Sequence, residues 1–172
     1  YMCQWVDSDL GGISDDYVGC DVQRGLGYTY NGDAFDESDS FSPGYGENPP
    51  AFGVDFFEGP YQDADGIDNP LTTNFSNAID SLGIPYEGIG IGYGDGVVDN
   101  ERFGMRRFVY YNNSGNQING EPSTPLHFYN YMNGIWKNGQ KMAYGGDGVS
   151  AATGANLDIE ADYMFPGDTD PF

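Results

Sequence analysis

Short runs of aspartate mixed with glycine and asparagine constrain this chain more than any other feature. The densest run is GPYQDADGIDNP, residues 59–70, which carries four oxygen-bearing side chains within seven residues: Asp63, Asp65, Asp68 and Asn69. Aspartate, asparagine, glycine and proline favour turns, because they compete with or disrupt the regular backbone hydrogen bonding of helices and strands. We therefore expect a loop here, whose carboxylates either face solvent or surround a cation.

The whole chain shares this bias. It has 172 residues, with 27 acidic and 6 basic side chains, a formal net charge of −21 and 27 glycines. Such a charge disfavours nucleic acid and anionic membranes as partners, and no apolar run is long enough to span a bilayer. The 14 Tyr, 11 Phe and 2 Trp nevertheless argue for a packed interior, because disordered chains are poor in aromatic residues. We expect one folded domain over residues 1–172, in which bound cations would relieve the repulsion between carboxylates.

Three further groups of oxygen-bearing side chains are candidate cation ligands. They are Asp7, Asp9, Asp15, Asp16 and Asp21 near the start, Asn31, Asp33 and Asp36 after a predicted strand, and Asp95, Asp99, Asn100 and Glu101 in a third acidic loop. Ca²⁺ accepts six to eight oxygens in flexible geometry, which suits loops of this composition. The 59–70 loop is not an EF-hand, because Gly66 comes too early and the closing Glu is missing. For each group the alternative is a solvated turn or a charged face.

The periodicity predicts a mainly β, loop-rich, β-sandwich-like domain with one short α-helix at about residues 125–137. In the predicted strand 25–31, Tyr28 and Tyr30 share one side. Further strands are expected at 51–58, where alternate apolar side chains would face the core, and at 108–111. Residues 141–148 are expected to form a short strand and a turn. The helix begins with Thr124 as its N-cap and Pro125 in its first turn, and it places apolar side chains at helical spacing as far as Trp136.

The remaining reactive side chains are few. Cys3 and Cys20 are close enough in sequence to form a disulfide in an oxidising compartment, and two buried free thiols are the alternative. Residues 80–82, Asp-Ser-Leu, match a short O-glycosylation signal of Bacteroidota, so Ser81 is a candidate glycan site. His127 has no second histidine or cysteine nearby in sequence, so we expect it to pack at the helix start rather than bind zinc.

No nucleophile motif, zinc-protease motif or phosphate-binding loop is present, and 27 acidic residues offer no means of choosing a catalytic pair. We therefore expect binding rather than catalysis. The chain begins at Tyr1 without an initiator methionine, and we expect it to be a mature fragment or one domain of a longer protein.

Several longer runs resemble a domain of large secreted Bacteroidota proteins, of the kind exported by the type IX secretion system. These runs include DDYVGCD at 15–21, NPPAFGVDFFEGP at 48–60, DADGIDNP at 63–70, GYGDGVVDNERFGMRRFVYYNN at 92–113 and FYNYMNGIWKNG at 128–139. The resemblance covers most of the chain. It implies an extracellular location and little chemistry.

Taken together, these features predict a secreted, calcium-binding structural module of a cell-surface, matrix or filament protein, which associates with further copies of itself. The alternative is a calcium-dependent carbohydrate-binding or adhesion module, in which aromatic rings stack on sugar faces. Two or three aromatic side chains in line on an exposed face would favour this alternative.

Overall fold

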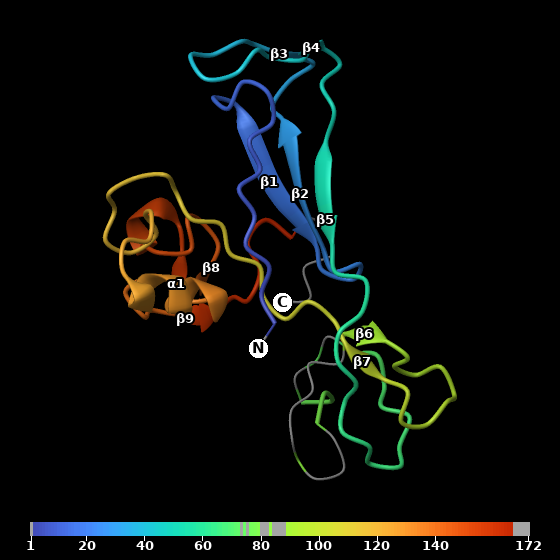
Figure 1. Ribbon diagram of the computed structural model, residues 1–172. Coiled ribbons are helices and arrows are strands. Elements are labelled where there is room, and N and C mark those ends of the chain that lie inside the picture. The colour runs from blue at the N-terminus through green and yellow to red at the C-terminus, as the bar shows by residue number, and fades with distance from the viewer. Residues whose placement is uncertain (1, 73, 75, 80–82, 84–88, 167–172) are drawn as a thin grey trace. The chain divides into compact units, whose positions relative to one another are not determined.

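The computed structural model describes residues 2–72, 74, 76–79, 83 and 89–166 (Figure 1). The chain divides into two compact units, and each is built from segments that are distant in sequence. Unit 1 comprises residues 1–8 and 107–164, and unit 2 comprises residues 9–106 and 165–172. The sequence predicted one domain, and that prediction stays untested by this division.

The described residues are mainly β with one short α-helix, as predicted. In chain order the elements are β1 (Asp16–Asp21), β2 (Leu26–Asn31), β3 (Phe35–Asp36), β4 (Gly46–Glu47), β5 (Phe52–Asp55), β6 (Gly90–Ile91), β7 (Arg102–Phe103), α1 (Pro125–Met132), β8 (Ala143–Tyr144), the 3₁₀ turn η1 (Ala151–Thr153) and β9 (Asn156–Glu160). The described strands are grouped in one three-stranded sheet and three two-stranded ones, rather than in the two larger sheets of a sandwich.

The largest sheet of unit 2 is antiparallel, with strand order β1-β2-β5 (Figure 1). Asp16 lies opposite Asn31 and Cys20 lies opposite Gly27. Because side chains alternate along a strand, Asp16 and Cys20 lie on one face, and Tyr17 lies on the other. The predicted strand at 25–31 is confirmed. Strand β1 was not predicted, because its two aspartates and its acidic neighbours resemble a loop.

Strand β5 is shorter and less buried than predicted. Only Phe52–Asp55 are extended, and they pair with β2 alone, so β5 is an edge strand among the described residues. Phe52 is 44% exposed, whereas Val54 and Phe56 are half-buried. The predicted alternation of apolar side chains along this segment is correct. Their predicted burial is only partly correct, because none of the three side chains is fully buried.

The helix of unit 1 begins where predicted and ends earlier. Thr124 is the N-cap, and its side chain accepts the backbone N–H of His127. The helix ends at Met132 and not at residue 137, because Asn133 caps it and Gly134 adopts the left-handed conformation, with φ +68°. The Nδ1 atom of His127 accepts the N–H of Ser123 at 3.2 Å, so the histidine packs at the helix start.

The core of unit 1 lies beside the helix and beyond its end. Trp136 is 1% exposed and packs with Tyr131 and Met142. Phe128 and Met132, which the helical spacing predicted to face inward, are 43% and 49% exposed. The inward face belongs instead to Asn130 and Tyr131, because the chain turns at Gly134 and carries Trp136 back over them.

Residues 2–8 belong to unit 1, and the side chain of Trp5 packs them against its aromatic residues. The ring of Trp5 lies 5.2 Å from that of Tyr111 and 5.4 Å from that of Phe128, measured between centroids. Tyr111 stacks in turn on Tyr131 at 5.2 Å. Aromatic pairs at this spacing contribute roughly 0.5–1.5 kcal/mol each beyond the area that they bury. Trp5 therefore joins residues 2–8 to the core of unit 1.

The apolar residues 163–165 are partly buried. Tyr163 is buried, Met164 is half-buried and Phe165 is 48% exposed. The predicted strand at 108–111 is wrong. Phe108 forms only an isolated bridge with Tyr163, because the paired stretch extends over too few residues to make a strand.

Among the described residues, no helix combines the length and the apolar character that crossing a bilayer would need.

Candidate functional site

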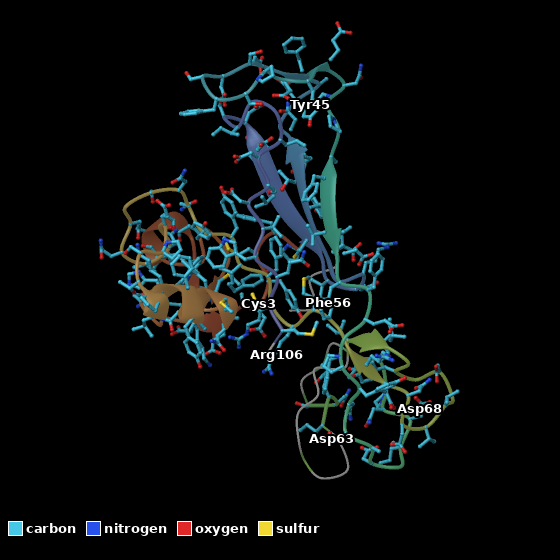
Figure 2. The ribbon with its side chains drawn as sticks, in the orientation of Figure 1. Cys3, Tyr45, Phe56, Asp63, Asp68 and Arg106 are labelled. Atoms are coloured by element: carbon cyan, nitrogen blue, oxygen red, sulfur yellow. The ribbon has the colours of Figure 1, made fainter. Side chains whose placement is uncertain are left out.

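Two of the predicted acidic groups meet in unit 2. Strands β6 and β7 are antiparallel neighbours, and the loop between them contains residues 94–101. On the other side of β7, Tyr61 bridges to Arg102, and the N–H of Gln62 donates to the carbonyl of Glu101 at 2.9 Å. The 63–69 loop therefore starts beside the end of the 94–101 loop. Asp63 and Asp68 lie in this part of unit 2 (Figure 2).

The carboxylates of each loop accept backbone N–H groups of the other. Oδ1 of Asp99 accepts the N–H groups of Asp65 and Gly66, at 2.8 and 2.9 Å. The two oxygens of Asp68 accept those of Gly94 and Gly96, at 2.8 and 2.7 Å. We call residues 63–69 and 94–101 the acidic clasp.

A buried glutamate closes the clasp. Glu101 is 2% exposed, and its Oε1 accepts the N–H of Asn69, itself 3% exposed, at 2.6 Å. Hydrogen bonds to an ionised acceptor contribute about 1.5–3 kcal/mol each, and a buried carboxylate without a donor would be costly. The clasp is thus held by hydrogen bonds from carboxylates to backbone N–H groups that lie 26 to 34 residues away in the sequence.

The remaining oxygens of the clasp decide what it can bind. Asp65 and Asp95 accept the N–H groups of Ile67 and Val97 in Asx turns, and Asn100 donates to Asp95 at 3.0 Å. Each carboxylate oxygen has two lone pairs, so one N–H bond leaves room for a cation. Nowhere in the described ranges do three or more His, Cys, Asp or Glu side chains gather as a metal-binding group. Calcium binding at the clasp stays a prediction.

The other predicted acidic residues fall into several places. Six of them belong to unit 2, at the start of β1, at the end of β2 and in the segments beside these strand ends: Asp9, Asp15, Asp16, Asn31, Asp33 and Asp36. Asp21 lies at the opposite end of β1 and forms an ion pair with Arg24. Asp7 belongs to unit 1. The five acidic residues near the start of the chain therefore do not form one group.

A row of three tyrosines lies on the face of the sheet formed by alternate residues of β1 and β2. The ring centroids of Tyr17 and Tyr30 are 5.9 Å apart, and those of Tyr30 and Tyr28 are 6.0 Å apart. Tyr17 is 56% exposed, Tyr30 is 43% exposed and Tyr28 is half-buried. We call these residues the tyrosine row.

Two glycines allow the row to lie against the sheet. A Cβ atom on Gly19 would lie 2.5 Å from the ring of Tyr28, and one on Gly32 would lie 2.6 Å from the ring of Tyr17. The rings therefore occupy the space that side chains at these positions would fill. Tyr17 was missed in the sequence. Along β1, Tyr17 and Gly19 share one face, and Val18 and Cys20 share the other. This period of two residues was the signal that could have revealed the strand and its exposed tyrosine.

The other predicted modification sites gain no support. Cys3 is exposed, Cys20 is buried, and the two belong to different units. Burial raises the pKa of the Cys3 thiol. The disulfide stays a prediction, which an intact mass would test. Ser81 lies outside the described residues.

No protein-family model, curated protein or solved structure matches this chain, so the resemblance to secreted Bacteroidota proteins stays a prediction.

Proposed function

We propose that this chain is a secreted, calcium-binding structural module of a cell-surface, matrix or filament protein. The observation that carries the proposal is the acidic clasp, in which two acidic loops predicted separately as cation sites lie against each other. The resemblance to exported Bacteroidota proteins supports the extracellular location, where Ca²⁺ is abundant.

The chemistry of the clasp favours Ca²⁺ over other metals. Its candidate ligands are carboxylate and amide oxygens, which are hard donors, and they sit on loops that can adjust their geometry. Mg²⁺ demands strict octahedral geometry and keeps its waters, so it is the weaker candidate. In a chain with a formal net charge of −21, a bound divalent cation also relieves repulsion between the carboxylates.

Calcium is expected to raise the melting temperature of protein that has been stripped with EDTA. A ligand at 100 times its Kd stabilises the folded state by about 2.7 kcal/mol for each independent site. Replacing Asp99 by asparagine tests the clasp, because the amide oxygen can still accept the N–H groups of Asp65 and Gly66 while the charge is removed. Asparagine also tolerates the φ of +57° found at this position. We therefore expect Asp99→Asn to reduce the rise in melting temperature that calcium causes, while it changes the melting temperature in EDTA much less.

The control is Asp158→Asn, which removes the same charge from an exposed position in β9. If Asp99→Asn and Asp158→Asn retain equal responses to calcium, the clasp is not the site. An unchanged melt of the wild type on adding calcium would remove the proposal altogether. Light scattering on the same samples reports whether calcium also joins copies of the chain, as a filament or matrix role requires.

The tyrosine row favours a second candidate function, carbohydrate binding. Neighbouring aromatic rings on an exposed face are the feature that distinguishes this alternative, and the row has three such rings, two of them well exposed. The C–H bonds of a sugar ring pack on an aromatic face, while the hydroxyl groups at its edge bind polar neighbours. Tyr17 and Tyr30, at 56% and 43% exposed, are the rings of the row that are available for such a contact.

Glycan arrays followed by titration would test this second function. Replacing Tyr30, the central ring, by alanine should weaken binding about tenfold, which corresponds to the loss of roughly 1.4 kcal/mol of stacking. Tyr129→Ala is a matched control, because Tyr129 is 61% exposed but lies on α1 of unit 1. The carbohydrate function fails if no glycan binds, or if both variants bind as tightly as the wild type.

A further inference from the structure

Two buried side-chain oxygens at one end of the β1–β2 pair have no hydrogen-bond donor. They are Oδ1 of Asp16 and Oδ1 of Asn31. These residues are directly opposed in the strand register, so their side chains share a face, with Cβ atoms about 5 Å apart. Both oxygens are acceptors, and two acceptors side by side repel each other unless a positive group lies between them.

Asn31 cannot turn its oxygen away without losing other bonds. The residue is 7% exposed. Its Nδ2 atom donates to the carbonyl oxygens of Asp33 and Phe35, at 3.3 Å each. A flipped amide would bring its oxygen against these two carbonyls, so the observed orientation is the one that the turn after β2 imposes. The unpartnered oxygen therefore stays on the face that carries Asp16.

A second buried carboxylate lies close to this pair. Asp36 is 1% exposed and accepts the N–H groups of Gly12 and Tyr45, both at 2.7 Å. The N–H of Leu10, two residues before Gly12, donates to Oδ2 of Asp16 at 3.0 Å. One short turn thus bonds to both carboxylates and holds them near each other.

The charges around this pair are negative. Burial raises the pKa of Asp16, and repulsion from the carboxylates of Asp36, Asp15 and Asp9 raises it further, against the opposing effect of the Leu10 N–H. The nearest basic side chain along β1, that of Arg24, is paired with Asp21 at the other end of the strand. No ion pair to Asp16 or Asp36 occurs among the described residues.

We propose that Asp16, Asn31 and Asp36 bind a divalent cation of the Ca²⁺ class at this end of the sheet. The set offers two carboxylates and an amide oxygen, and Ca²⁺ fills its remaining positions with backbone carbonyls and water. We call these residues the sheet-end site. None of them belongs to the acidic clasp, so this site stands or falls independently of the calcium site proposed there.

The sheet-end site is also linked to the tyrosine row. Tyr17 follows Asp16 and Tyr30 precedes Asn31, so a cation held between the two strands fixes the backbone on which both exposed rings are mounted. The neighbouring tyrosines make Tb³⁺ a suitable probe. This ion replaces Ca²⁺ at oxygen sites, and its luminescence is excited through nearby aromatic rings.

Asp16→Asn is the decisive variant. Its amide oxygen can still accept the Leu10 N–H, while its Nδ2 can donate to Oδ1 of Asn31. We expect Tb³⁺ titration to show one ion fewer per chain than in the wild type, and the melting temperature in EDTA to be equal or higher. The control Asp33→Asn removes a charge from the same turn and retains an acceptor for the Phe35 N–H, and it should bind as many ions as the wild type.

A proton held by Asp16 and donated to Oδ1 of Asn31 is the rival explanation, and the ion count separates the two. Under this explanation Asp16→Asn, whose Nδ2 can donate in the same place, binds as many Tb³⁺ ions as the wild type. The cation proposal expects one ion fewer.

A second variant covers the case in which Asp16→Asn does not fold. Asn31→Asp adds a carboxylate, which should tighten Tb³⁺ binding and lower the melting temperature in EDTA. An unchanged ion count in Asp16→Asn, equal loss in Asp33→Asn, or a Tb³⁺ affinity that Asn31→Asp does not raise would each overturn the proposal. Loss of the calcium response in Asp99→Asn alone would leave it intact.

Discussion

Replacing Trp136 by alanine is expected to unfold unit 1 at room temperature or bring it close to unfolding. Trp136 is 1% exposed and packs on Tyr131 and Met142. Truncating a buried tryptophan to alanine costs about 3–5 kcal/mol, because the lost contacts are not recovered by collapse of the surrounding side chains. A small domain is stable by only about 5–15 kcal/mol in total, so this loss removes much of the reserve.

The indole also satisfies a buried carbonyl. Its Nε1 donates to the oxygen of Gly148 at 3.0 Å, and this carbonyl also accepts the N–H of Ala143 at 2.9 Å, so the variant loses one of the two bonds. Near-ultraviolet circular dichroism and urea unfolding would measure the effect, with Leu126→Ala on α1, where the side chain is 63% exposed, as the control. A loss below about 1 kcal/mol for Trp136→Ala would contradict the core described here.

Gly59→Ala is expected to disrupt the pairing that positions the acidic clasp. A Cβ atom at Gly59 would lie 1.8 Å from the carbonyl oxygen of Phe103, closer than any real contact, and the obstacle is backbone that cannot rotate away. Two hydrogen bonds hold this segment against β7. The N–H of Phe103 donates to the Pro60 carbonyl at 3.0 Å, and the Arg102 guanidinium donates to the Gly59 carbonyl at 3.1 Å. Moving the two backbones apart to relieve the clash would therefore break these bonds.

Overpacking of this kind costs typically about 1–3 kcal/mol, and more where the neighbour is backbone. Gly115→Ala is the matched control, because a Cβ there meets nothing within 4 Å and the backbone is not in the left-handed region. Urea midpoints would compare the two variants. Equal stability for both would show that the 59–62 segment does not pack against β7 as described.

Local chemistry explains which elements were predictable from the sequence. The helix start was predictable, because Thr124 and Pro125 satisfy or remove the first free N–H groups. Its end was predicted too late, since apolar spacing continued to Trp136 while Gly134 had already turned the chain. Strand β2 was predictable from its alternating tyrosines. Its partner β1 was not, because pairing with β2 outweighs the weak strand preference of aspartate and glycine.

The candidate sites show the same division. The acidic residues of the clasp could be named from composition and spacing alone. Their partners could not, since the bonds from Asp99 to residues 65 and 66 join positions more than thirty residues apart. Spacing reveals which oxygens are present and not which N–H groups they face. The sheet-end site needed the strand register, which places Asp16 opposite Asn31.

The discontinuous make-up of unit 1 has a consequence for how the chain folds. Residues 2–8 join this unit through Trp5, whose ring partners Tyr111 and Phe128 follow more than a hundred residues later. Within this sequence, residues 2–8 therefore reach their place only after residues 111 and 128 are available. Until then the ring of Trp5 lacks these partners, and closing so long a loop costs conformational entropy before any contact offsets it. Residues 9–106 make up nearly all of unit 2, so most of this unit can form before the later part of the chain is available.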